Sequence, residues 1–124
     1  MNLLNLLLVA VGGALGSTAR YLLSMLVLRV SGSPFPFGTF VVNLLGCIVF
    51  GVIAGAAEHR VPLAPASRAF LLVGVLGGFT TFSSYAFESF ALLREGQFLS
   101  ASLNIVGQVI AGLAGVSLGF ALAH

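Results

Sequence analysis

A cluster of hydroxyl side chains interrupts an apolar stretch of this chain at Gly77–Tyr85. No charged residue lies between Ala69 and Phe87, so the stretch is long enough to cross a bilayer. Its glycine pair, followed by two threonines and two serines, predicts a helix that is broken near Gly77–Thr81. Lipid cannot satisfy free backbone groups, and a broken membrane helix that lines a polar cavity is a typical ion site. The alternative is close helix packing, in which hydroxyl groups bond to their own helix.

Uncharged polar side chains in three apolar stretches favour an anion as the ligand. Amide and hydroxyl donors replace the hydration of an anion without trapping it, whereas cation pores carry carboxylates. Phe82 and Tyr85 lie one helical turn apart and can turn their positive ring edges to an anion, although packing is their ordinary role. Arg20 lies within the first apolar stretch and either faces a cavity or extends to the membrane surface. The amide and hydroxyl candidates are Asn43, Ser83, Ser84, Asn104 and Gln108.

The titratable residues do not form a catalytic set. Glu88 lies near the end of its apolar stretch and is either functional or an interfacial carboxylate. His59 lies in a connection and His124 at the last position, and the sequence contains no phosphate loop, dinucleotide glycine motif or metalloprotease pattern. The single Cys47 excludes an internal disulfide and a cysteine-pair metal site. We therefore predict that the protein is not an enzyme.

The composition indicates an integral membrane protein. Of the 124 residues, 59% are hydrophobic and only 6% are charged, and the mean hydropathy is +1.15. A water-soluble domain of this size would lack the polar surface needed to cover itself. The net charge of +2 comes from scattered arginines and glutamates, which argues against a nucleic-acid-binding surface.

Four apolar segments predict an all-α fold with four transmembrane helices in one membrane domain, residues 1–124. Four crossings place both termini on the same side of the membrane. The patterns Gly12-x-x-x-Gly16 and Gly51-x-x-x-Gly55 predict close helix contacts. The predicted spans are residues 3–28, 38–57, 68–93 and 98–123.

The arginines do not indicate one orientation in the membrane. Orientation normally follows an excess of Lys and Arg in the cytoplasmic loops. Here Arg60 and Arg68 lie on the side of the termini, and Arg29 and Arg94 lie on the other side, so the tally is two against two. A chain without bias can insert both ways, and we predict an antiparallel homodimer with dual topology. The alternative is a fixed orientation that depends on details outside this count.

Three motifs in order make the chain resemble the Fluc (CrcB-type) fluoride channel family. The likeness covers essentially the whole chain, including the four spans and the short loops. The motifs are Gly12-Gly13-x-x-Gly16-x-x-x-Arg20, Gly38-Thr39-x-x-x-Asn43-Leu44-x-Gly46, and Gly77-Gly78-Phe79-Thr80-Thr81-Phe82-Ser83 with Gly74 before it and Glu88 after it.

The resemblance implies a passive fluoride channel in the cell inner (plasma) membrane, built as a dual-topology homodimer with two antiparallel pores. By similarity, Asn43 lines the pore and Phe82 belongs to an aromatic box that contacts fluoride. Tyr85 stands where the family has a second phenylalanine, and its phenol can turn a hydroxyl toward the ion. Arg20 matches an arginine in the vestibule. The polar track corresponds to Ser83, Ser84, Asn104 and Gln108.

The resemblance also implies a structural sodium ion at the dimer interface. The backbone carbonyls of Gly77 and Thr80 from both subunits would hold it, because backbone oxygens suit a hard cation.

Two other classes of membrane protein remain as alternatives. A small multidrug-resistance-type cation exporter also has four short spans, but it needs a carboxylate deep in the membrane, where this chain has Arg20. A non-conducting accessory subunit has little use for the amides and the broken helix. The sequence therefore favours the fluoride channel.

Overall fold

The computed structural model describes residues 2–124, and that range contains helices, turns and short connections but no strand. Four helical segments are long and apolar enough to cross a membrane, which confirms the predicted number. The third of these, Pro65–Arg94, is divided into shorter elements. In chain order the elements are α1 (Leu3–Ser31), α2 (Phe37–His59), α3 (Pro65–Arg68), η1 (Ala69–Leu76), α4 (Gly77–Phe79), α5 (Phe82–Arg94) and α6 (Phe98–Leu122).

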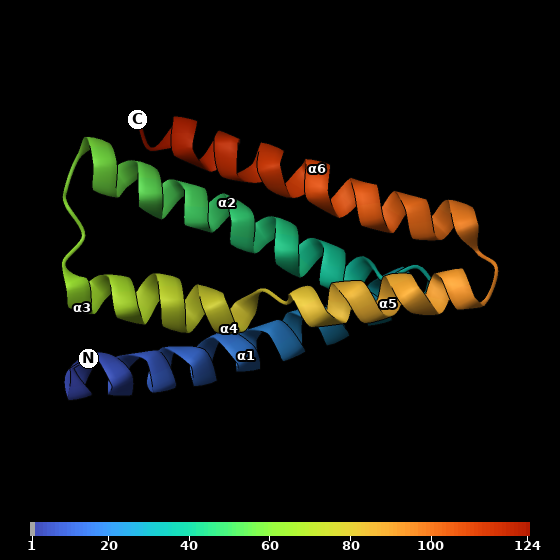
Figure 1. Cartoon of the computed structure of the whole chain (residues 1–124), viewed down its shortest axis with the longest axis horizontal. Coiled ribbons are helices and arrows are strands. Elements are labelled where there is room, and N and C mark those ends of the chain that lie inside the picture. Colours follow the sequence, from blue (N-terminus) through green and yellow to red (C-terminus); the bar gives the residue numbers. More distant parts are fainter. Residues whose placement is uncertain (1) are drawn as a thin grey trace.

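The four segments lie side by side, and consecutive segments run in opposite directions (Figure 1). The N-terminal end, the C-terminus and the connection between α2 and α3 lie at one end of the molecule, and the turns after α1 and α5 lie at the other. Both termini are therefore on the same side, as four crossings require. α2 packs against α6, and α1 packs against η1 and α4.

The third segment breaks at two threonines rather than at the glycine pair. Thr80 and Thr81 are extended, with φ/ψ of −84°/155° and −145°/117°. Gly77 is helical, with φ −63° and ψ −36°. The predicted break near Gly77–Thr81 is thus confirmed only at its C-terminal end. The helix resumes because the Thr81 side chain caps α5 by accepting a hydrogen bond from the Ser84 N–H at 3.2 Å.

The glycines instead allow neighbouring helices to approach closely. A Cβ atom added to Gly12 would lie 2.6 Å from the Phe70 carbonyl oxygen, and one added to Gly55 would lie 2.7 Å from that of Phe120. The first contact joins α1 to η1, and the second joins α2 to α6. Both predicted small-residue seams are therefore real helix contacts.

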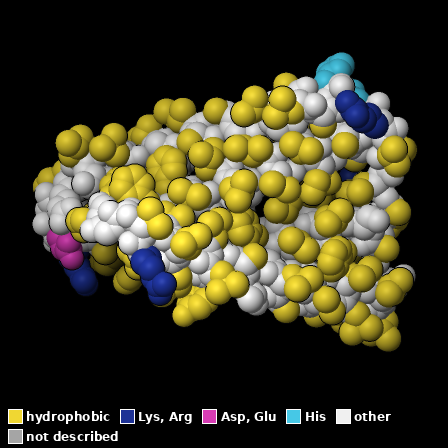
Figure 2. Space-filling model, turned by 180° about the vertical axis from the view of Figure 1, so that it is seen from behind, with side chains coloured by type: hydrophobic (Ala, Val, Ile, Leu, Met, Phe, Trp, Pro, Cys, Tyr) yellow, Lys and Arg dark blue, Asp and Glu magenta, His cyan; other side chains and the backbone are white. Residues whose placement is uncertain are grey.

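Most of the large apolar side chains point outward. Figure 2 shows a surface covered by hydrophobic side chains, with charged groups gathered toward the ends of the molecule. Among the described residues, Val42 and Asn104 are the largest side chains that are completely buried. A surface of this kind suits contact with lipid or with a second apolar surface.

Candidate functional site

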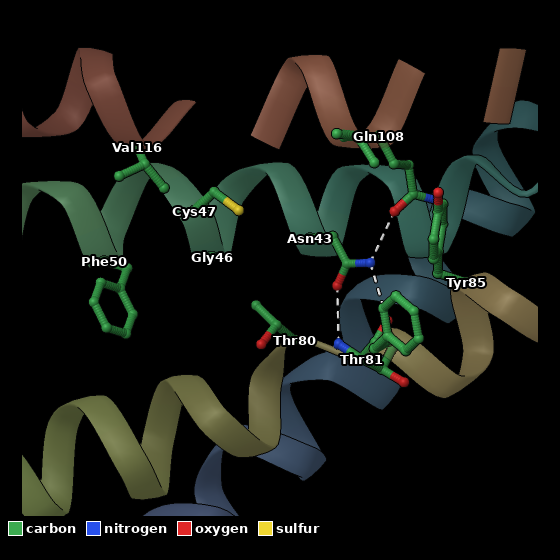
Figure 3. A pocket seen from close by; sticks show the side chains of 11 residues that line it. Asn43, Gly46, Cys47, Phe50, Thr80, Thr81, Tyr85, Gln108 and Val116 are labelled. Atoms are coloured by element: carbon green, nitrogen blue, oxygen red, sulfur yellow. Dashed lines mark hydrogen bonds between the residues drawn. The ribbon is translucent and has the colours of Figure 1, made fainter. Parts of the chain in front are cut away.

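A pocket of about 520 Å³ lies between α2, α6 and the break in the third segment. It is open on one side, and Figure 3 shows Asn43 near its centre, facing Thr81 and Gln108. The break places polar groups beside an otherwise apolar wall. The lining side chains include Asn43, Cys47 and Phe50 from α2, Thr80 and Thr81 from the break, Phe82 and Tyr85 from α5, and Gln108 from α6.

Asn43 holds the extended backbone at the break. Its Oδ1 accepts a hydrogen bond from the Thr81 N–H at 2.9 Å, and its Nδ2 donates to the Thr81 carbonyl at 3.1 Å. This reciprocal pair replaces the helical hydrogen bonds that the break removes, so Asn43 stabilises the very conformation that opens the pocket.

A chain of amides leads from Asn43 toward α5. Asn43 Nδ2 also donates to Gln108 Oε1 at 2.8 Å, and Gln108 Nε2 donates to Asn104 Oδ1 at 2.9 Å. Asn104 Nδ2 then donates to Ser89 Oγ at 2.9 Å. Four polar side chains from three helices thus form one connected network of neutral groups.

Two aromatic rings line the pocket. The ring centroids of Phe82 and Tyr85 are 5.6 Å apart at an interplanar angle of 50°. Phe82 is 78% exposed in the single chain, whereas Tyr85 is partly buried and donates its hydroxyl to the Ile105 carbonyl at 2.6 Å. The expectation that the Tyr85 hydroxyl turns to the ion does not match this structure, because that proton is already used between α5 and α6.

Arg20 binds the break from the α1 side. Its Nε donates to the Gly78 carbonyl at 3.1 Å, and Ser17 Oγ lies 3.5 Å from the same oxygen. Arg20 is not among the residues that line the pocket. In the single chain its guanidinium therefore satisfies a carbonyl that the broken helix leaves free.

In a continuous helix, the N–H groups of Thr81 and Ser84 would donate to the carbonyls of Gly77 and Thr80. At the break these N–H groups have other acceptors. The Thr81 N–H bonds to Asn43 and the Ser84 N–H bonds to the Thr81 hydroxyl, each in place of a carbonyl four residues earlier. The carbonyls of Gly77 and Thr80 thus join the Gly78 carbonyl among the oxygens that lose their helical donors. Backbone carbonyl oxygens are suitable ligands for a hard cation, because hard cations bind oxygen ligands.

Thr39 and Glu88 form a second polar contact, in which the Thr39 hydroxyl donates to the Glu88 carboxylate. The sequence identified Glu88 as a candidate, but it did not identify Thr39 as its partner. Thr39 lies four residues before Asn43, so these two side chains lie on the same face of α2. This spacing is the sequence signal that could have identified Thr39 as a neighbour of Asn43. Ser89 was missed as well, although it follows Tyr85 by one helical turn.

The structure brings together only part of the predicted set. Asn43, Phe82, Tyr85 and Gln108 all line the pocket. Asn104 lies behind Gln108 and is completely buried. The remaining candidates, Arg20, Ser83 and Ser84, are close to the break but are not part of the pocket wall.

A family model described as "CrcB-like protein, Camphor Resistance (CrcB)" matches residues 7–120 of the chain. The match includes all the residues that line the pocket.

Several curated relatives are similar over most of their length. The fluoride-specific ion channel FluC of Maridesulfovibrio salexigens is 47% identical over 116 residues, which cover 94% of this chain and 92% of that protein. The FluC channel of Nitratidesulfovibrio vulgaris (strain DSM 19637 / Miyazaki F) is 48% identical over 114 residues, or 92% of each chain. The FluC channel of Methylobacillus flagellatus is 48% identical over 117 residues, or 94% of this chain and 91% of that protein.

Proposed function

The chain belongs to the CrcB family, and on that premise we propose that it is a fluoride-selective passive ion channel. The observation that carries this proposal is the identity of almost one half, over more than nine-tenths of the chain, to relatives named fluoride-specific ion channels. A channel lets an ion cross the membrane and transforms no substrate, so the protein is not an enzyme. Its four helices make it a multi-pass membrane protein.

The pocket has chemistry that suits fluoride. Asn43 and Gln108 contribute neutral amide groups, and Phe82 contributes an exposed ring whose edge carries partial positive charge. Fluoride is small and holds its water tightly, so donors must stand close together to replace that water. We assign Asn43, Phe82, Tyr85 and Gln108 to the pore, with Arg20, Ser83 and Ser84 near its entrance.

The channel would export fluoride that enters the cell as the neutral acid HF. HF dissociates at the pH of the cytoplasm, and the trapped anion then leaves through the channel down its electrochemical gradient. Such export needs no energy source and lowers the toxicity of fluoride. It requires that the protein lie in the cytoplasmic (inner) membrane.

Efflux from liposomes that contain only this protein tests the proposed function. A fluoride-selective electrode should record rapid fluoride release once a potassium ionophore balances the charge, whereas chloride release stays at the level of empty liposomes. Absence of fluoride release from correctly folded protein would contradict the proposal and would favour an accessory subunit.

We further propose that the working unit is an antiparallel homodimer of oppositely inserted chains. The even division of arginines supports it, since Arg29 and Arg94 lie in last turns at one end and Arg60 and Arg68 lie at the other. The open side of the pocket and the exposed Phe82 also suit closure by a second copy.

Fixing the orientation tests the dimer. Two lysines added to the connection between α2 and α3 should hold that side in the cytoplasm and abolish fluoride resistance in cells. A copy biased the opposite way should restore resistance when both are expressed. Full resistance from either fixed copy alone would overturn dual topology.

A sodium ion between the two subunits would satisfy the carbonyls of Gly77 and Thr80. An unpaired buried carbonyl costs about 1–3 kcal/mol, so several of them facing one another need a cation. We expect fluoride efflux to fall when sodium is exhaustively replaced by a large organic cation and to recover when sodium returns. Unchanged efflux after verified sodium removal would exclude a required ion at this position.

A further inference from the structure

A second hollow, the α1–α2 groove, lies between the last turns of α1 and the first turns of α2. Its volume is about 430 Å³, and it shares no lining residue with the pocket that contains Asn43. Five of its six lining residues are apolar, and its wall exposes no polar surface. The lining residues are Leu26, Val27, Val30 and Ser31 from α1 and Phe37 and Val41 from α2.

The α1–α2 groove lies at the edge of the membrane. α1 ends at Ser31 and α2 begins at Phe37, and both helices are long and apolar enough to cross the bilayer. The groove therefore begins near the level of the lipid headgroups and extends toward the hydrocarbon. An apolar hollow at this depth is filled by an acyl chain, because water finds no hydrogen-bond partner on its wall.

The apolar wall cannot by itself distinguish one phospholipid from another. A lipid tail is as apolar as the side chains of the groove, so a tail gains little free energy on moving from the bilayer into it. Phospholipids with different headgroups can also carry the same tails. Any preference must therefore come from a charged or polar group beside the groove.

Arg29 provides a charged group in this position. It lies in the last turn of α1, next to Val30 and three residues after Leu26, so it is a neighbour of the groove on the helix surface. A long arginine side chain can lay its methylene groups along apolar surface and place its guanidinium among the headgroups. At this end of the molecule, the left in Figure 2, basic side chains lie directly beside hydrophobic ones.

The Arg29 guanidinium is available for a ligand. Three other arginines are bound within the chain: Arg20 and Arg60 donate to backbone carbonyls, and Arg94 lies over an aromatic ring. Arg29 is exposed, and no described residue offers it such a contact. The planar guanidinium matches two oxygens of a phosphate group with parallel N–H donors.

We propose that the α1–α2 groove binds an anionic phospholipid, with one acyl chain in the groove and the phosphate group on Arg29. An anionic headgroup is favoured over a zwitterionic one, because it carries no cation that competes with the guanidinium. One arginine at the membrane surface should favour the anionic lipid roughly fivefold, and this preference should fall as the salt concentration rises. The site does not depend on which ion the protein conducts.

Quenching of a single tryptophan by brominated lipids tests the site. The chain contains no tryptophan, so Phe37→Trp places the only indole at the groove. The full-length variant is reconstituted into phosphatidylcholine vesicles that contain matched fractions of brominated phosphatidylglycerol or brominated phosphatidylcholine. At low salt, the quenching curves should give a roughly fivefold higher relative affinity for phosphatidylglycerol.

Two substitutions separate Arg29 from the general charge of the surface. Arg29→Gln in the Phe37→Trp background should remove the preference. Arg94→Gln is the matched control, because it removes one positive charge from the same end and changes the arginine tally equally, but its guanidinium lies over an aromatic ring of its own helix. This control should keep the preference. A reporter on exposed surface at the same end, Leu99→Trp near the start of α6, should be quenched equally by both lipids.

A second measurement needs no tryptophan and applies if Phe37→Trp does not fold. Phosphatidylglycerol added to the wild-type protein in detergent should raise the midpoint of thermal unfolding more than phosphatidylcholine does, because a ligand of the folded state stabilises it. Arg29→Gln should abolish this difference, and Arg94→Gln should retain it. Equal midpoints with the two lipids in the wild type would contradict the proposal.

Three quenching results would overturn the proposal. Equal quenching of Phe37→Trp by both lipids would mean that the groove holds acyl chains without selecting the headgroup. No quenching of Phe37→Trp, with normal quenching of Leu99→Trp, would mean that a second copy of the chain covers the groove. A preference that survives Arg29→Gln, or that Arg94→Gln removes to the same extent, would mean that Arg29 does not bind the phosphate.

Discussion

The break in the third segment is bound in two different ways on its two sides. On the α1 side, the charged Arg20 donates to the Gly78 carbonyl with the help of Ser17. On the α2 side, the neutral Asn43 binds both backbone groups of Thr81 and continues to Gln108. The first contact involves one carbonyl, and the second extends into the pocket.

The difference separates a contact that only holds the break from one that holds it and also lines a path for an anion. A guanidinium at a free carbonyl forms a strong hydrogen bond, and that bond uses the donor. Neutral amides form weaker individual bonds, but their network leaves the second Gln108 hydrogen free. We therefore assign permeation mainly to the Asn43 side, which also stabilises the break, and only stabilisation of the break to the Arg20 side.

The largest effect is expected for Asn43→Ala. It removes the partners of the Thr81 N–H and carbonyl and frees the Gln108 amide to turn. Fluoride efflux should fall about 10- to 150-fold, as expected for the loss of one hydrogen bond to the anion at the barrier. The measurement is electrode-recorded efflux from liposomes at matched protein content.

Asn43→Asp separates the two roles of Asn43. The carboxylate still accepts from the Thr81 N–H but has no hydrogen for Gln108, and it adds a negative charge beside the path. Efflux should be lost while the protein remains folded. Normal efflux in either variant would mean that the path does not run past Asn43.

A smaller effect on transport is expected for Arg20→Ala. The Gly78 carbonyl loses its charged donor, which should lower the free energy of unfolding by about 1–2 kcal/mol, with fluoride efflux per folded protein reduced only a few-fold. Thermal unfolding in detergent and efflux from the same preparation check both values. Efflux reduced as much as in Asn43→Ala, with unchanged stability, would place the arginine in the conducting path, as the vestibule role implies.

The smallest effect is expected for Tyr85→Phe. The ring remains, and only the hydrogen bond to the Ile105 carbonyl is lost, which costs about 0.5–1.5 kcal/mol of stability. Fluoride efflux should stay close to wild type, because the hydrogen of this hydroxyl is already donated to the Ile105 carbonyl. A large fall in efflux would show that the hydroxyl itself contacts the ion.

Local composition was enough to predict several of these features. An uncharged run with a glycine pair and clustered hydroxyls predicts a broken membrane helix, and glycines four residues apart predict close helix contacts. The i, i+4 spacing of Asn104 and Gln108 predicts that they share one face of α6, and they are indeed bonded to each other.

The features that the sequence did not predict depend on how the helices pack. The break lies at Thr80 and Thr81 because Asn43 from α2 takes the Thr81 N–H, a partner that no local pattern around the threonines identifies. In the same way, α6 brings the Ile105 carbonyl within reach of the Tyr85 hydroxyl. Pairings across helices depend on register and rotation, which are set by packing over the whole length of the chain.

The most direct test of the central claim is the reversal potential of the channel in a planar bilayer. A fluoride gradient is set against an opposite chloride gradient, so that the two anions predict potentials of opposite sign. A path lined by closely spaced neutral donors should give a reversal potential at the equilibrium value for fluoride. A potential near zero, or one at the chloride value, would contradict the account.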